Sequence, residues 1–134
     1  MNTIIRKLVL PVSERMLSAL EQRISNTVGS VITISFKDPD YSPSKGGFHP
    51  VEIRLERQGE YLRLSYITDF CYVGMGDNWE LAKELDFDFD CKVFQNMDGV
   101  YSIKSAVEIY QVWESNFLSY WLEMDVFTVT ISPE

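Results

Sequence analysis

Residues 51–64, with the sequence VEIRLERQGEYLRL, predict two antiparallel β-strands joined by a tight turn. Val51, Ile53 and Leu55 alternate with charged residues, which is typical of a strand that has one buried and one solvated face. The Gln-Gly pair at 58–59 supplies the turn. This hairpin favours an antiparallel sheet, because parallel strands need a long crossover between them.

The second strand of this hairpin continues to about residue 73 and is rich in aromatic residues. Its period of two predicts that alternate side chains lie on one face of the sheet. The residues expected on that shared face are Leu62, Leu64, Tyr66, Thr68, Phe70 and Tyr72.

Helices are expected at both ends of this sheet. Ser13 is a typical helix cap, and apolar residues recur at helical spacing up to Val28. A wide apolar stripe over 107–121 predicts a second helix at 104–123. Further strands are expected at 31–36, 84–95, 100–103 and 126–131, with a helical turn at 79–83. We therefore expect one α+β domain over residues 1–134, with an antiparallel meander sheet of about six to seven strands flanked by an N-terminal and a C-terminal helix.

Charge is distributed unevenly along the chain, whose formal net charge is −8. Residues 1–68 contain nine Lys or Arg and seven Asp or Glu, whereas residues 69–134 contain three Lys and thirteen Asp or Glu. Such acidity opposes direct binding to nucleic acid or to anionic lipid. No segment resembles a membrane span or a signal peptide, and two cysteines suit a reducing compartment. We expect a cytoplasmic protein without cofactors.

The acidity is concentrated in residues 84–91, where Asp86, Asp88 and Asp90 alternate with apolar residues. On a strand, these carboxylates would stand ~6.5 Å apart on the face opposite to the core. A calcium loop is excluded, since Cys91 replaces the required glycine and Met97 replaces the closing glutamate. A solvated sheet face and a docking surface for a basic partner both remain open. The acids expected to assist such docking are Asp69, Asp77 and Glu80.

His49 is the only histidine, and it follows the Gly46-Gly47 pair in a loop rich in proline. A catalytic dyad with Cys71 or Cys91 would need a lowered thiol pKa, and the sequence offers no basic residue placed to lower it. The same three residues fall short of the four ligands of a structural zinc site. The sequence therefore predicts neither catalysis nor a metal site, and a ligand pocket near this loop is the alternative.

Four strings together resemble an uncharacterised bacterial family of short proteins, known from marine and enteric gammaproteobacteria and often carried on genomic islands. They are the sequences at 45–53 (KGGFHPVEI), 66–70 (YITDF), 84–89 (ELDFDF) and 93–95 (VFQ). The family's fold is similar to that of the mitochondrial glycoprotein family, whose members are acidic, form rings and bind many basic proteins. The resemblance implies partner binding in an oligomer without known catalysis, and it transfers no site residues. The final strand departs from the helical end of the mitochondrial proteins.

These observations predict a non-enzymatic binding module with an acidic surface. We expect it to dock basic protein partners and to form a homo-oligomer, with the apolar stripe at 107–121 as the candidate subunit contact. The alternative prediction is a small-ligand binder or an enzyme with its pocket near Gly46-Gly47 and His49.

Overall fold

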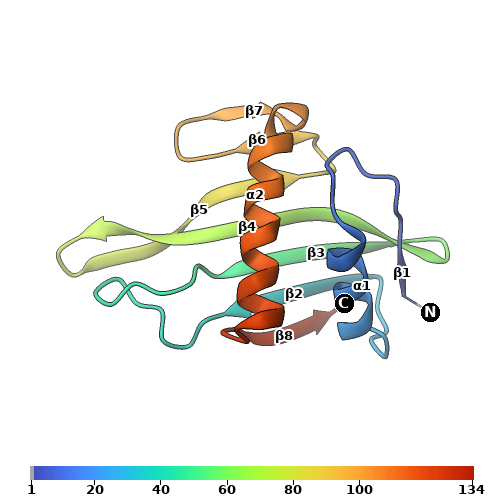
Figure 1. Cartoon of the computed structure of the whole chain (residues 1–134), viewed down its shortest axis with the longest axis horizontal. Coiled ribbons are helices and arrows are strands. Elements are labelled where there is room, and N and C mark those ends of the chain that lie inside the picture. Colours follow the sequence, from blue (N-terminus) through green and yellow to red (C-terminus); the bar gives the residue numbers. More distant parts are fainter. Residues whose placement is uncertain (1) are drawn as a thin grey trace.

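The structure is a computed structural model that describes residues 2–134, and its centre is a twisted, mainly antiparallel β-sheet (Figure 1). The strand order across the sheet is β7-β6-β5-β4-β3-β2-β8, and β1 pairs in parallel with the first residues of β4. The strands are β1 (Thr3–Ile4), β2 (Val31–Lys37), β3 (Val51–Gln58), β4 (Tyr61–Met75), β5 (Asn78–Asp88), β6 (Val93–Gln95), β7 (Val100–Ser102) and β8 (Thr128–Pro133). The α+β class and the meander from β2 to β7 are as predicted.

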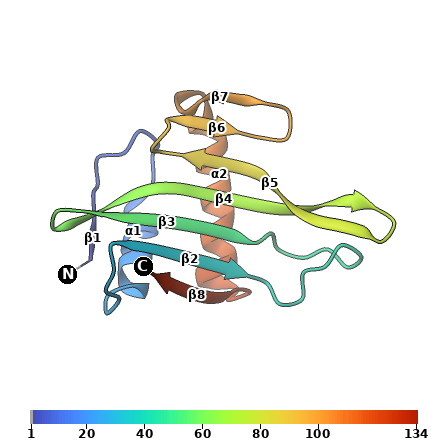
Figure 2. The same ribbon diagram turned by 180° about the vertical axis from the view of Figure 1, so that it is seen from behind.

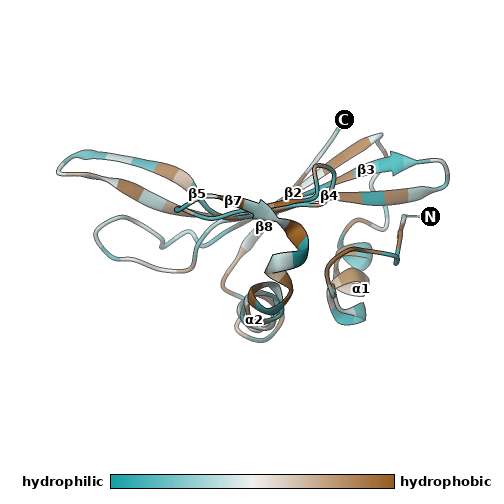
Figure 3. Ribbon diagram, turned by 90° about the horizontal axis from the view of Figure 1, so that it is seen from above, coloured by the Kyte–Doolittle hydropathy of each residue, from teal (hydrophilic) through white to brown (hydrophobic). Residues whose placement is uncertain are grey.

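Both α-helices, α1 (Glu14–Arg23) and α2 (Val107–Leu118), lie on the same face of the sheet (Figure 3). Within residues 2–134, no helix covers the opposite face, which Figure 2 shows from the front. α2 runs across the strands because it connects β7 at one edge with β8 at the other. A 3-10 turn, Ile103–Ala106, leads into α2, and a π-helical turn, Ser119–Glu123, ends it.

Aromatic rings fix α2 on the sheet. The ring of Phe36 in β2 lies 5.0 Å from Phe117 and 4.8 Å from Trp121, both in edge-to-face geometry. At the other end of the helix, Phe87 in β5 lies 5.1 Å from Tyr110. Such pairs contribute ~0.5–1.5 kcal/mol each beyond their buried area. Most of the stripe that could have formed a subunit contact therefore faces the protein's own core.

Glu114 is the polar exception in this stripe, and its buried carboxylate accepts two hydrogen bonds. It is buried, and its Oε1 accepts hydrogen bonds from the backbone N–H of Ser13 (2.8 Å) and from the hydroxyl of Tyr110 (2.9 Å). Ser13 in turn caps α1 as predicted, since its Oγ accepts from the N–H of Met16. The two helices are thus joined through one carboxylate.

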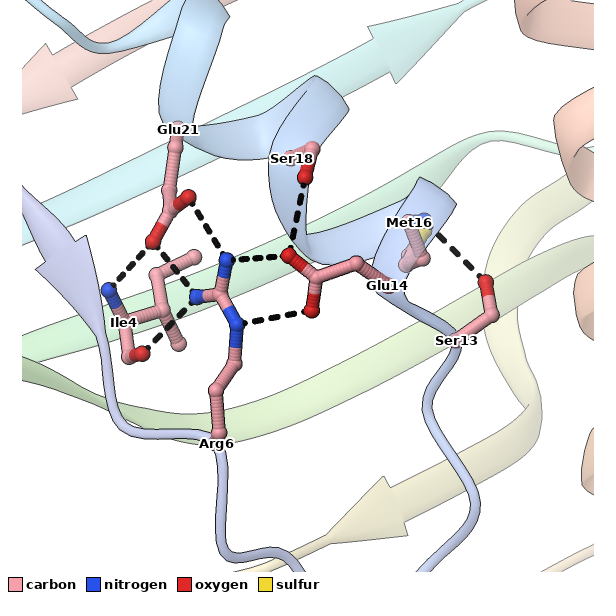
Figure 4. A network of polar contacts seen from close by, with 7 residues as sticks. All are labelled: Ile4, Arg6, Ser13, Glu14, Met16, Ser18 and Glu21. Carbon is pink, nitrogen blue, oxygen red and sulfur yellow. Dashed lines mark hydrogen bonds and ion pairs between the residues drawn. The ribbon is translucent and has the colours of Figure 1, made fainter.

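The N-terminal segment is fastened to α1 by Arg6 (Figure 4). Its guanidinium lies between Glu14, at 2.8 Å, and Glu21, at 2.5 Å. Glu21 also accepts the backbone N–H of Ile4 at 2.8 Å. Residues 2–6 therefore close the end of the core that α2 does not reach.

A β-bulge reverses the faces of the long strand β4, and a second bulge lies in the strand beside it. The pairing with β3 slips after Leu64, and the extra residue Ser65 turns its hydroxyl to Glu56 on the open face. Beyond it, Ile67 and Asp69 face the helices, whereas Tyr66 and Thr68 face away. The prediction of one continuous face from Leu62 to Tyr72 was therefore wrong, because a bulge inverts the alternation without leaving a mark in the apolar pattern.

The second bulge lies in β5, where Asp69 pairs with Leu85 and Phe70 pairs with Lys83. Glu84 is the extra residue between them, and it lies on the helix side together with Leu85. Beyond this bulge, β4 and β5 continue as a hairpin that projects past α2 (Figure 1). We call residues 71–82 of this hairpin the arm.

Other expectations differ from the structure at the ends of elements. The predicted helical turn at 79–83 is strand β5 instead, because the arm pairs it with β4. α1 ends at Arg23 rather than near Val28, which is exposed. β5 ends at Asp88, so the predicted strand at 84–95 is divided by a turn before β6.

Candidate functional site

The structure brings together three side chains that can hold protons or metal ions. They come from three separate places: His49 from the loop before β3, Asp69 from β4 and Glu84 from the bulge in β5. Nδ1 of His49 lies 2.9 Å from Oδ1 of Asp69 and 2.6 Å from Oε2 of Glu84. Their ligand atoms all lie within 4.8 Å of one another. We call this group the triad.

Buried contacts set the orientation of the triad. Asp69 is only 8% exposed, and its second oxygen, Oδ2, accepts a hydrogen bond of 2.9 Å from the indole Nε1–H of Trp113 in α2. The loop that carries His49 is held on both sides. The N–H of Phe48 donates to Asp38 at 3.0 Å, and the carbonyl of Pro50 accepts from Phe70 at 2.9 Å. The fold therefore holds the triad in place, even though His49 belongs to a loop.

A cavity of about 400 Å³ opens beside the triad, between α2 and the sheet. This volume lies in the range of small-molecule sites. The triad and Asn116 supply its polar groups. The apolar walls consist of Phe48, Val51, Leu85, Trp113, Phe117, Tyr120 and Phe127. An aromatic cavity with one polar end is the usual design of a ligand pocket.

The two carboxylates affect the charge of the histidine. The hydrogen bond with Asp69 raises the pKa of His49 against the opposing effect of burial, and the charges of Asp69 and Glu84 raise it further. Without another cation, a protonated His49 leaves the triad with one net negative charge. The polar end of the pocket therefore attracts positive charge.

The acids singled out in the sequence are dispersed. Asp86 lies on the open face, as predicted, but it is only 7% exposed, and it accepts a hydrogen bond from Thr68 at 2.7 Å. Asp90 is exposed and paired with Arg63 at 2.9 Å. The expected row of three free carboxylates was therefore wrong at both ends, because neighbouring strands bring their own polar side chains to it.

The three assisting acids lie elsewhere. Asp69 belongs to the pocket on the opposite face of the sheet, because the bulge at Ser65 reverses its direction. Asp77 and Glu80 are exposed on the arm. Only these two of the three share a surface.

The cysteines lie outside the triad and are both free thiols. Burial raises the pKa of Cys71, and a hydrogen bond to Asp88 raises that of Cys91. In the predicted strand at 84–95, Cys91 would alternate with the acids and face the core, but it is exposed in the turn after β5. Raised pKa values leave little of the nucleophilic thiolate at neutral pH.

Reasoning from the sequence named His49 and the loop before it, but it did not find Glu84 or Trp113. The one available signal was Asp69, which is the only acidic residue in the sequence of this long strand. The two bulges bring the side chains of Asp69 and Glu84 to the same face of the sheet, and neither bulge is visible in the sequence pattern.

Together, the fold and the site define a small α+β domain with an aromatic-walled pocket of ligand size, beside which the triad lies. The chain belongs to the family described as "protein of unknown function (DUF2787)", whose profile matches residues 11–132. This confirms the resemblance to an uncharacterised family. A comparison with curated proteins found no match.

Two solved structures from Vibrio cholerae pathogenicity islands are similar over nearly the whole chain. The hypothetical protein VC0508 from island VSP-II is 30% identical with a TM-score of 0.88, covering 98% of this chain and 99% of that one. The conserved hypothetical protein VC1805 from island VPI-2 is 34% identical with a TM-score of 0.84, covering 98% and 100%. VC1805 is described as sharing structural homology with the human P32 protein. This agrees with the expected similarity to the mitochondrial glycoprotein fold.

Within residues 2–134, no helix has both the length and the apolar character needed to span a membrane.

Proposed function

We propose that this protein is a non-enzymatic, cytoplasmic binding module that docks basic protein partners through its arm. The observation that carries the proposal is a group of large apolar side chains exposed on the projecting hairpin. Met75 is 84% exposed, Trp79 44% and Leu81 45%. Exposed apolar groups of this size are typical of protein-binding surfaces, and tryptophan is the residue type most enriched among binding hot spots.

The charges around this group favour a basic partner. Asp77 lies at the tip of the arm, and Glu80 follows Trp79 in the sequence and points to the other face of the same strand; both are exposed. Among residues 2–134, no ion pair engages either carboxylate. A chain with a formal net charge of −8 also attracts cationic partners over longer distances. Asp88, the last residue of β5, extends the proposed acidic surface. Asp90 in the turn beyond it is paired with Arg63, and the buried Asp86 and Asp69 do not contribute.

A pull-down with immobilised protein at low and high salt tests this proposal. Trp79→Ala should weaken capture of a retained basic partner by roughly 30-fold, which corresponds to ~2 kcal/mol at a hot spot. An Asp77→Asn/Glu80→Gln variant should weaken capture chiefly at low salt, because exposed charges are screened beyond ~8 Å at physiological ionic strength. The matched control is Asp98→Asn/Glu108→Gln, which removes two exposed charges away from the arm. Equal capture by all four proteins would refute the proposal.

We also propose that the protein forms a homo-oligomer. The support is the outer side of α2, where Val107, Ile109 and Val112 are exposed although most of the stripe is buried. Light scattering should then give a mass above 15.5 kDa that returns to the monomer value in an Ile109→Glu/Val112→Glu variant. A monomer for the unmodified protein would refute this part.

The pocket favours a second candidate function, which is the binding of a small ligand. Its aromatic walls and single polar end can enclose a small molecule between α2 and the sheet. Trp113 lines the pocket, so occupancy should change tryptophan emission in the unmodified protein. A Phe117→Ala variant, which alters a wall of the pocket, should bind such a compound differently. A compound that stabilises the protein without changing tryptophan emission, and that stabilises Phe117→Ala equally, would argue against this site.

A further inference from the structure

We propose that His49, Asp69 and Glu84 bind a divalent transition-metal ion whose open coordination positions face the pocket. This inference rests on the second candidate function only for the location of the pocket. Binding of the metal is measurable without any organic ligand.

The spacing of the triad matches that of ligands around one ion. Metal–nitrogen and metal–oxygen bonds in proteins are ~2.1 Å long, so neighbouring ligand atoms lie about 3 Å apart around an octahedral ion and about 3.4 Å apart around a tetrahedral one. Nδ1 of His49 and Oδ1 of Asp69 are 2.9 Å apart. Oε2 of Glu84 is somewhat closer to Nδ1, at 2.6 Å, and this half-buried side chain can move by the few tenths of an ångström required.

A single proton does not satisfy this arrangement. Nδ1 of a histidine carries at most one hydrogen, yet oxygens of two different carboxylates lie within 3 Å of it. One of the two carboxylates therefore lacks a full hydrogen bond at this point. A cation placed between the three atoms interacts with all of their lone pairs at once, and it removes the repulsion between the two carboxylates.

The surroundings resemble the outer shell of a metal site. Carboxylate ligands in such sites are themselves hydrogen-bonded, which fixes the oxygen that faces the ion. Here the indole N–H of Trp113 occupies Oδ2 of Asp69 and leaves Oδ1 directed at His49. The anchored residues on both sides of His49 restrict the loop in the same way.

The donor set selects the class of metal. One imidazole and two carboxylates suit Zn²⁺, Mn²⁺ or Fe²⁺, whereas Ca²⁺ takes six to eight oxygen ligands. Two carboxylates with a neutral imidazole carry a charge of −2, which a divalent ion neutralises. Three protein ligands leave at least one position open, and the pocket lies where a further ligand would enter.

Isothermal titration of the full chain with Zn²⁺, after removal of bound metal by a chelator, tests the proposal. We expect one saturable site per chain. Glu84→Gln and His49→Gln should each weaken binding by at least 100-fold, and Trp113→Phe should weaken it by roughly 10–100-fold, as outer-shell changes do. The control Asp77→Asn/Glu80→Gln removes two carboxylates from the arm and should bind as the unmodified protein does. Circular dichroism checks that each variant is folded, and Glu84→Gln is the decisive one because Glu84 is half-exposed.

Cobalt separates this site from the two thiols. Co²⁺ bound to the triad should give visible d–d bands without the near-ultraviolet charge-transfer band of a thiolate ligand. Three outcomes would overturn the proposal: no saturable binding, equal affinity in Glu84→Gln, or a thiolate band that shows Cys71 or Cys91 as a ligand. None of them bears on whether the pocket binds an organic molecule or the arm binds a protein.

Discussion

The ion pairs of Arg6 provide a quantitative test of how the N-terminal segment is held. The perturbation is a double-mutant cycle with Arg6→Met and Glu21→Gln. Arg6 contacts Glu21 through two nitrogen–oxygen pairs, at 2.5 and 2.9 Å, and the Glu21 side chain is only 22% exposed. Exposed ion pairs contribute ~0.2–1 kcal/mol. Because this pair is forked and partly shielded, we expect a coupling free energy of about 1 kcal/mol, at the upper end of that range.

The coupling should also depend on pH with a defined sign. Hydrogen bonds from Arg6, and a smaller effect from the N–H of Ile4, hold the pKa of Glu21 below 4.5. A carboxylate whose pKa is lower in the folded state contributes stability above its unfolded pKa and loses that contribution as pH falls through the folded pKa. The coupling should therefore be complete at neutral pH and decline below about pH 4.5.

Urea denaturation at neutral and acid pH measures both quantities. A parallel cycle with Glu14→Gln is the control, since the Glu14 side chain is 71% exposed and should couple more weakly to Arg6. Zero coupling to Glu21 at neutral pH, a stronger coupling to Glu14, or a coupling that grows as the pH falls would each refute the reasoning.

Three further predictions concern the site, the arm and the thiols. Trp113→Phe leaves Oδ2 of Asp69 buried without its donor, so the free energy of unfolding should fall by about 1–3 kcal/mol in a urea titration; an unchanged value would contradict the hydrogen bond. Gly74→Ala places a Cβ 1.8 Å from a backbone oxygen of the facing strand at a φ of +149°, so hydrogen exchange should accelerate in the arm while α1 and α2 stay protected. Because the pKa values of Cys71 and Cys91 are both raised, alkylation of the native protein at neutral pH should be slower than that of a free cysteine and should accelerate at alkaline pH. Rapid labelling of either thiol at neutral pH would show that its local environment differs from the one described.

The sequence was sufficient for the parts of the fold that regular periodicity encodes. Val51, Ile53 and Leu55 face the core as their alternation predicted, and the apolar stripe of α2 lies on the sheet. The cap at Ser13 was also predictable, because its chemistry involves only residues within one helical turn.

The candidate site depends on interruptions of that periodicity. Ser65 and Glu84 are bulge residues, and each looks like an ordinary polar member of a strand. Which residue of a strand is left unpaired depends on the register with the strand beside it, and one sequence cannot supply that register. Asp86 was expected on the face opposite to the core, and it lies there but is buried. The sequence alone could not show which side chains of the adjoining strand cover it.

The extra residue in β5 makes the pocket sensitive to chain length as well as to side-chain identity. Glu84 reaches the helix side because one residue more lies on β5 than on β4 at this point. Deletion of Glu84 would let Asp69 and Phe70 of β4 pair with consecutive residues of β5. No carboxylate from β5 would then remain beside His49. A relative that keeps His49 and Asp69 but lacks one residue in this strand should thus retain the sheet and the core while losing the third ligand. In this fold, the number of residues in a hairpin is itself part of the binding site.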